Sequence, residues 1–143
     1  LFLLLIIPFE VSAYEPTSNN YGNGEYAITK YDVNIKVNEN NTFNISEKIS
    51  AYFNVNKHGI YRKIPLKNTV IRLDGTTSYN RATISDVKVN DNFTSSISYG
   101  YKEIKIGDPY NTFKGAKDYE ISYLYNIGKD TGKGYDELYL NIG

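Results

Sequence analysis

Two ionisable residues of opposite charge, Glu47 and Arg62, occupy positions that a strand pattern assigns to a buried face. Over residues 43–53 every second residue is apolar except Glu47, and Ile60 and Ile64 flank Arg62 in the same way. Because side chains alternate between the two faces of a strand, both charges are expected to point inward. An isolated buried charge is costly, so the pattern predicts that the two residues form a buried ion pair.

This pair has a structural and a chemical interpretation. In the structural one, Glu47 and Arg62 fix the register of two strands, and the planar fork of the arginine matches a carboxylate. In the chemical one, Glu47 is a catalytic or ligand-binding carboxylate beside an anion-holding arginine, and an enzyme would use it with a second carboxylate such as Asp86. We favour the structural interpretation, because no catalytic or ligand constellation appears elsewhere in the sequence.

Composition argues against several classes of function. Sixteen basic and sixteen acidic residues leave no net charge, and neither kind forms a run, so the signature of a nucleic-acid-binding surface is missing. The chain has no cysteine, which excludes disulfides, thiol chemistry and cysteine-bearing zinc sites. One histidine leaves little for a metal centre or a catalytic triad. We therefore expect no metal, no cofactor and no enzymatic activity.

Three further features are weaker candidates for a site. His58 lies in a polar turn and is expected to be exposed. Residues 130–137 place carboxylates around two glycines, as a calcium loop does, but the spacing is not that of an EF-hand and a solvated loop is favoured. Tyrosines can stack on sugar rings, which makes a polysaccharide-binding module the alternative function. The tyrosines near turns are the candidates for exposed ligand contacts: Tyr99, Tyr101 and Tyr110.

The first residues are typical of an export signal. Leu1–Ile7 is an unbroken apolar run, and Val11–Ala13 has small residues at the spacing of a signal-peptidase site. The run is shorter than the roughly 20 residues that span a membrane. We predict a signal peptide over residues 1–13 that is truncated at its start, a flexible lead-in over 14–24 and one domain over 25–143. A buried N-terminal strand is the alternative for the apolar run.

From residue 25 onward the apolar residues recur with a period of two, which is typical of β-strands. Residues 38–41 supply a turn between strands over 31–37 and 42–54, and a change of phase near Thr29 predicts a bulge. Further strands are expected over 59–66, 69–73, 81–89, 94–99, 103–106, 118–127 and 137–142. Tyr119, Tyr123 and Tyr125 share a phase with apolar neighbours and are expected in the core.

The fold class that follows is all-β. About eight to nine short alternating strands predict an antiparallel β-sandwich, immunoglobulin-like in general architecture. Pro65 is expected to end its strand or to mark an edge, because proline cannot donate to a ladder.

Seven segments resemble, in the same order, those of domain-of-unknown-function family 2207, a set of predicted bacterial membrane proteins. The most specific is GIYRKIP at residues 59–65. The others lie at residues 26–37, 45–47, 84–89, 104–107, 119–123 and 137–141. The similarity covers residues 25–143, with Leu140 where the family often has tryptophan. It implies an N-terminal extracytoplasmic domain, followed by transmembrane helices and often a low-complexity tail, but no reaction.

The sequence thus predicts a non-catalytic domain on the extracytoplasmic face of the bacterial cell membrane. Its expected role is to mediate interactions at the cell envelope, through sheet edges or loops. The expected partners are a protein or another envelope component, and the membrane through segments absent from this sequence. Nucleic acid is not expected as a partner.

Overall fold

A computed structural model describes residues 24–72 and 74–129. These residues form nine strands and no helix, which confirms the predicted all-β class. The strands are β1 (Tyr26–Val37), β2 (Thr42–Lys57), β3 (Gly59–Pro65), β4 (Lys67–Ile71), β5 (Thr77–Arg81), β6 (Thr83–Val89), β7 (Phe93–Ser98), β8 (Tyr101–Gly107) and β9 (Phe113–Asn126). The predicted signal peptide, most of the lead-in and the predicted strand over 137–142 lie outside the described residues.

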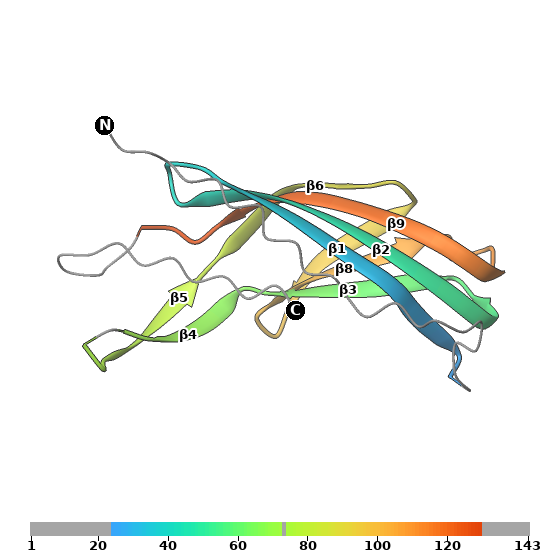
Figure 1. Cartoon of the computed structure of the whole chain (residues 1–143), viewed down its shortest axis with the longest axis horizontal. Helices are drawn as coiled ribbons and strands as arrows, with labels where there is room; N and C mark the ends of the chain where they lie inside the picture. Colours follow the sequence, from blue (N-terminus) through green and yellow to red (C-terminus); the bar gives the residue numbers. More distant parts are fainter. Residues whose placement is uncertain (1–23, 73, 130–143) are drawn as a thin grey trace.

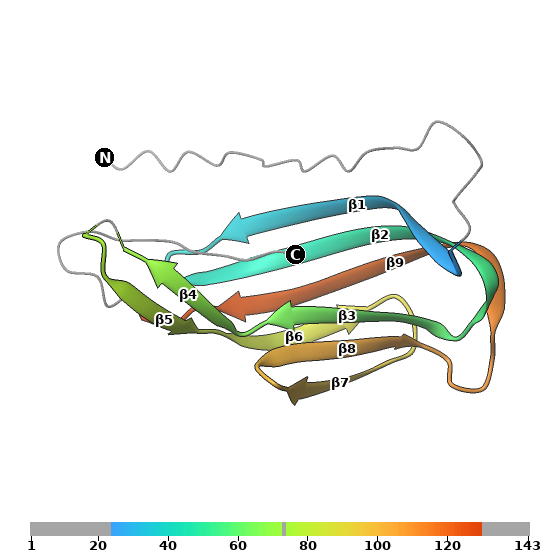
Figure 2. The same cartoon turned by 90° about the horizontal axis from the view of Figure 1, so that it is seen from below.

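The strands form two layers and a separate hairpin (Figure 1, Figure 2). The larger sheet has the order β1-β2-β9-β6, the smaller sheet has the order β3-β8-β7, and β4 pairs with β5. All pairings are antiparallel. This division into four and three strands matches the general architecture of an immunoglobulin constant domain, but the connections differ, because β9 lies in the middle of the larger sheet.

β1 and β2 form the expected hairpin. Their register runs from Tyr26 opposite Phe53 to Val37 opposite Phe43, with a shift between Ile28 and Lys30. This shift is the bulge that the change of phase indicates, and it keeps the apolar residues on both sides of it on one face.

The core lies between the two sheets. The inward residues of β2 and β9 supply most of it, and β3 and β8 supply the facing side. The fully buried side chains include Phe43, Ile45, Phe53, Ile64, Ile104, Ile106, Tyr119, Ile121 and Tyr125. Strict alternation on both layers places these residues inward, so burial of their apolar area is the main force that holds the sheets together.

The β4–β5 hairpin departs from the expected strand pattern. Residues 77–81 read TSYNR, without apolar alternation, and β5 was therefore not expected as a strand of its own. The hairpin is fastened to the sandwich at Asn68, which is buried and whose Nδ2 donates to the hydroxyl of Tyr125 at 3.2 Å. Pro65 ends β3, as expected.

Candidate functional site

Glu47 and Arg62 come from different sheets. Glu47 lies in β2, opposite Val33 of β1 and Ile121 of β9, whereas Arg62 lies in β3, opposite Ile104 of β8. β2 and β3 are not hydrogen-bonded neighbours. The pair therefore joins the two layers of the sandwich. The structural interpretation of the sequence predicted instead that the pair fixes the register of two strands.

The two side chains form a bidentate ion pair. Arg62 Nε donates to Glu47 Oε2 at 2.7 Å, and Arg62 Nη2 donates to Glu47 Oε1 at 3.1 Å. The hydroxyl of Tyr123 donates to the same Oε1 at 2.6 Å. The Glu47 side chain is 1% exposed and that of Arg62 is 13% exposed. Three donated hydrogen bonds thus replace the water that the carboxylate loses on burial.

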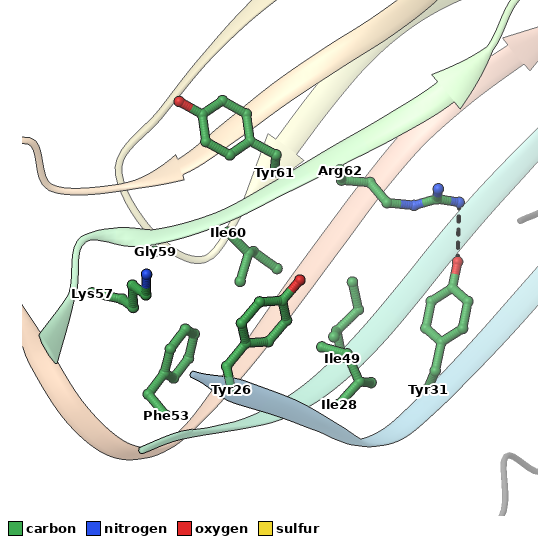
Figure 3. Close-up of a pocket in the computed structure, with 10 residues that line it drawn as sticks. All are labelled: Tyr26, Ile28, Tyr31, Ile49, Phe53, Lys57, Gly59, Ile60, Tyr61 and Arg62. Carbon is green, nitrogen blue, oxygen red and sulfur yellow. Dashed lines mark hydrogen bonds between the residues drawn. The ribbon is translucent and has the colours of Figure 1, made fainter. Parts of the chain in front are cut away.

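Arg62 has further partners on its outer side. Its Nη1 donates to the backbone oxygen of Lys63 at 2.7 Å, and its Nη2 donates to the hydroxyl oxygen of Tyr31 at 3.1 Å (Figure 3). The guanidinium carbon lies 5.9 Å from the centroid of the Tyr31 ring, within the range of a cation–π contact. Tyr31 is on β1, so the cluster connects β1, β2, β3 and β9.

The ionisation states agree with this arrangement. Burial alone would lower the pKa of Arg62, but the hydrogen bonds and the charge of Glu47 raise it above its ordinary value. Burial, with the charge of Glu47, raises the pKa of Tyr31 to about 12 and holds that of Tyr123 well above its usual range. At neutral pH both phenols therefore keep their protons, and Tyr123 acts as a neutral donor to the carboxylate.

The Tyr123 hydroxyl is expected to contribute measurable stability. Tyr123→Phe should lower the free energy of unfolding by about 1–3 kcal/mol, because it removes a donor to a buried carboxylate. Tyr119→Phe is the matched control, since Tyr119 is fully buried on the same strand but its hydroxyl has no hydrogen-bond partner among the described residues. Denaturant unfolding of both variants measures the difference. Equal losses in the two variants would contradict the assigned role of Tyr123.

An apolar cleft opens beside the ion pair (Figure 3). It encloses about 450 Å³ between β1 and β3, with β2 beneath it. Figure 3 shows the side chains of Tyr26, Phe53 and Ile60 turned towards this space, while that of Tyr61 points away from it. Arg62 and Tyr31 lie at one end of the cleft. We call it the β1–β3 cleft.

The three tyrosines expected near turns are exposed but do not form one surface. Tyr99 is 100% exposed, Tyr110 is 91% exposed and Tyr101 is 44% exposed. Tyr99 and Tyr101 lie at the start of β8, and Tyr110 follows its other end, so that the length of the strand, roughly 20 Å, separates them. The three rings therefore do not form one line that could stack on a sugar chain.

The other candidate residues do not join the ion pair. Asp86 lines a groove with Asn34 and Ser46 on the outer face of the larger sheet, whereas Glu47 points between the sheets. The two carboxylates that the enzyme hypothesis combined are thus on opposite faces. His58 is exposed, as expected, and its Nδ1 donates to the backbone oxygens of Asp108 at 3.0 Å and Asn111 at 2.9 Å, which holds the loop between β8 and β9.

Two classes of feature are missing from the part of the chain that the structure describes. No group of three histidine, aspartate or glutamate side chains there is placed to hold a metal ion. Nor does that part include a helix that is long and apolar enough to cross a membrane. The loop over residues 130–137, the calcium candidate, lies outside the described residues.

The two phenols that complete the site were not predicted from the sequence. Tyr123 was expected only as a core residue, and Tyr31 only as the first residue of a strand over 31–37. The usable signal was their phase, since both are inward tyrosines on strands that flank β2. Each lies two residues from a residue paired with Glu47: Tyr31 from Val33, and Tyr123 from Ile121.

Comparison with known proteins identifies the family. No curated protein and no solved structure matches the chain. A family model described as "Predicted membrane protein (DUF2207) N-terminal domain" matches residues 27–142. This range includes the whole ion-pair cluster and the GIYRKIP segment that positions Arg62. The chain therefore belongs to the DUF2207 family, as an N-terminal domain of a predicted membrane protein.

Proposed function

We propose that the chain is a non-catalytic extracytoplasmic domain of a bacterial membrane protein, and that it mediates interactions at the cell envelope. Its partner is a protein or another envelope component. The observation that carries the proposal is a set of large apolar side chains that stand exposed on the β4–β5 hairpin and beside the turn between β7 and β8. We call it the hairpin surface and define it by Ile71, Tyr79, Ile97 and Tyr99.

Large side chains stand exposed on the hairpin surface. Ile71 is 74% exposed and Tyr79 is 84% exposed, and both lie on the face of the hairpin opposite to Asn68. Ile97 is 70% exposed beside the β7–β8 turn. The base of the hairpin adjoins the β7–β8 turn, because the backbone nitrogen of Leu66 donates to the oxygen of Gly100 at 2.8 Å. Exposed aromatic and aliphatic side chains are common in protein contacts.

The enclosure of the charged cluster supports the non-catalytic part of the proposal. A catalytic carboxylate must reach a substrate or a water molecule. Glu47 is 1% exposed and receives hydrogen bonds from Arg62 and Tyr123. These contacts favour a role in holding the sheets, so the interaction surface has to lie elsewhere.

The location follows from the family and from the first residues of the sequence. The family is one of predicted membrane proteins, and the apolar run over residues 1–7 precedes a small-residue site at 11–13. Together they support export of the domain to the outer side of the membrane.

A single cysteine tests the location, because the chain has none of its own. Tyr99→Cys in the full membrane protein should react in intact cells with a maleimide that cannot cross the membrane. Phe43→Cys, at a position that is 0% exposed, is the control for unfolded protein. Labelling of Tyr99→Cys only after the cells are opened would contradict an extracytoplasmic location.

Site-specific cross-linking tests the interaction role. A photo-reactive phenylalanine analogue at Tyr79 or Tyr99 of the full protein should give the same cross-linked product in cells. The analogue at Tyr110 is the matched control, because this tyrosine is equally exposed but lies at the far end of β8. Ile97→Asp should abolish the product from Tyr79. Equal products from all three positions, or none from the hairpin surface, would contradict the proposal.

A further inference from the structure

The strand β7 forms one edge of the smaller sheet. Within the described residues it pairs only with β8, and Figure 2 shows it as the outermost strand of that sheet. All six of its residues are exposed, and they include two large apolar ones, Phe93 at 37% and Ile97 at 70%. An edge of this kind presents a row of backbone groups with which another strand can pair.

β7 has none of the features that usually protect an edge strand from pairing. Its sequence is FTSSIS, with no charged residue and no proline, and its register with β8 runs without a bulge. The edge strand of the larger sheet, β6, is different. Its ladder with β9 is interrupted between Ser85 and Lys88, and Asp86 there has φ +54°. Bulges and charges of this kind block the approach of a further strand, and β7 lacks both.

The pairing with β8 determines which backbone groups of β7 face outward. The backbone nitrogen of Gly107 donates to the oxygen of Asn92 at 2.7 Å, one step beyond the opposed pair of Phe93 and Ile106. Hydrogen-bonded and non-hydrogen-bonded pairs alternate along an antiparallel ladder. Every second residue of β7 therefore bonds to β8, and the other three direct their N–H and C=O groups to the outer edge: Phe93, Ser95 and Ile97.

We propose that the outer edge of β7 pairs antiparallel with β7 of a second copy of the chain, about a two-fold axis at Ser95. In this register Ser95 lies opposite Ser95 of the second copy, and Phe93 lies opposite Ile97. The outward N–H and C=O groups of these three residues bond across the axis. The two smaller sheets then form one continuous sheet.

The sequence of β7 is complementary to itself in this register. Its two large apolar residues, Phe93 and Ile97, lie two positions to either side of Ser95, so that each meets the other type across the axis. Phe93 and Ser95 lie opposite core residues of β8, so this row of side chains is on the core face of the sheet. Aromatic–aliphatic pairs across strands are stabilising, and β7 has no charge that would oppose a like charge. A two-fold axis requires such a self-complementary patch.

The dimer goes beyond the proposed interaction role and does not rest on it. It shares Ile97 with the hairpin surface, whereas Tyr79 and Tyr99 lie outside the strand pair. Its test substitutes none of these three residues, so the dimer and the interaction role can fail separately. An interface of one strand pair is small for a stable complex, and covalent trapping is therefore the suitable measurement.

Single cysteines in the full membrane protein test the register, since this chain has none of its own. With a mild oxidant, Ser95→Cys should form a disulfide between two copies, because opposed residues of a hydrogen-bonded pair have Cα atoms about 5.5 Å apart. Thr94→Cys alone and Ser96→Cys alone should form none, because each is about 8 Å from its own copy. Copies with Thr94→Cys and copies with Ser96→Cys, expressed together, should form the mixed disulfide. The unmodified protein is the control.

Three results of the cysteine test overturn the proposal. Disulfides from Thr94→Cys alone as readily as from Ser95→Cys indicate random collision. A disulfide or adduct of Ser95→Cys with a different protein indicates that another partner occupies the edge. The absence of any disulfide from both Ser95→Cys and the mixed copies shows that the two strands do not meet.

Ser95→Pro tests the backbone pairing, because proline has no N–H to donate. The N–H of Ser95 faces away from β8, so proline is compatible with the β7–β8 ladder, as on natural edge strands. In both of the mixed cysteine copies, Ser95→Pro should lower the yield of disulfide at least about tenfold, whereas Ser95→Ala, which keeps the N–H, should change it by less than about twofold. An equal yield with proline and alanine overturns the proposal.

A charge exchange at the same position distinguishes loss of pairing from damage to β7 itself. Ser95→Lys in both of the mixed cysteine copies places two like charges opposite each other and should lower the yield of disulfide. Ser95→Lys in one copy with Ser95→Glu in the other should restore it, which an unfolded strand could not do. Equal yields for like and unlike charges overturn the proposal.

Discussion

Replacement of Arg62 by methionine lowers the free energy of unfolding by about 3–5 kcal/mol. The substitution leaves the Glu47 carboxylate buried, with Tyr123 as its remaining side-chain donor among the contacts described above. Methionine fills a similar volume, so the loss comes from the uncompensated charge and not from a cavity. Equilibrium unfolding in urea measures the change.

Two controls separate this effect from a general loss of charge. The double replacement of Glu47 and Arg62 by methionine should unfold at nearly the free energy of the unmodified protein, because no buried charge remains. Lys48→Ala breaks the exposed ion pair with Glu120, whose nitrogen and oxygen are 3.2 Å apart, and should cost less than about 1 kcal/mol. A loss of that small size in Arg62→Met would contradict the buried pair.

Gly59→Ala is expected to be the second most damaging substitution. Gly59 lies opposite Gly107 in the β3–β8 ladder with φ +154°, and an added Cβ would be 1.8 Å from the backbone oxygen of Ile106. Backbone cannot move aside as a flexible side chain can, so the two strands must separate. We expect a loss of about 3 kcal/mol or more in the free energy of unfolding, which combines overpacking with backbone strain.

Gly115→Ala is the control for backbone strain alone. Gly115 also lies in a strand at positive φ, +104°, but a Cβ there would meet no atom of the described residues within 4 Å. Its cost should be about 1–2 kcal/mol. Equal losses for the two alanine variants would show that the close approach of β3 and β8 is not as described.

The sequence predicted the faces of the strands better than their neighbours. Alternation alone placed Glu47 and Arg62 inward, and the change of phase near Thr29 located the bulge in β1. These are local properties with a fixed period of two residues. The turn at residues 38–41 was predictable for the same reason, because asparagine-rich turns have a local chemistry.

The sequence could not predict which sheet each strand joins. The final position of β9 between β2 and β6 brings Tyr123 to Glu47, and this contact depends on a pairing over 76 residues of sequence. Strand order is set by the total burial of all the inward faces. No single segment of the sequence specifies that order. Because strand order could not be predicted, the ion pair was expected to fix the register of two strands. In the structure it joins the two layers.

The cluster gives the sandwich a specific alignment of its layers. Apolar residues hold two sheets together but tolerate small shifts, whereas the bidentate contact of Arg62 with Glu47 has one geometry. Tyr31 and Tyr123 hold the same two side chains from β1 and β9. We therefore interpret Glu47 as the point at which both layers are aligned, and the segment GIYRKIP as the strand that carries its partner.

A double-mutant cycle between positions 47 and 62 tests this claim most directly. The unfolding free energies of Glu47→Met, Arg62→Met, the double variant and the unmodified protein give the coupling between the two side chains. A buried pair predicts a coupling of about 2 kcal/mol or more, with the double variant more stable than either single one. Additive losses, with a coupling of zero within error, would contradict the account.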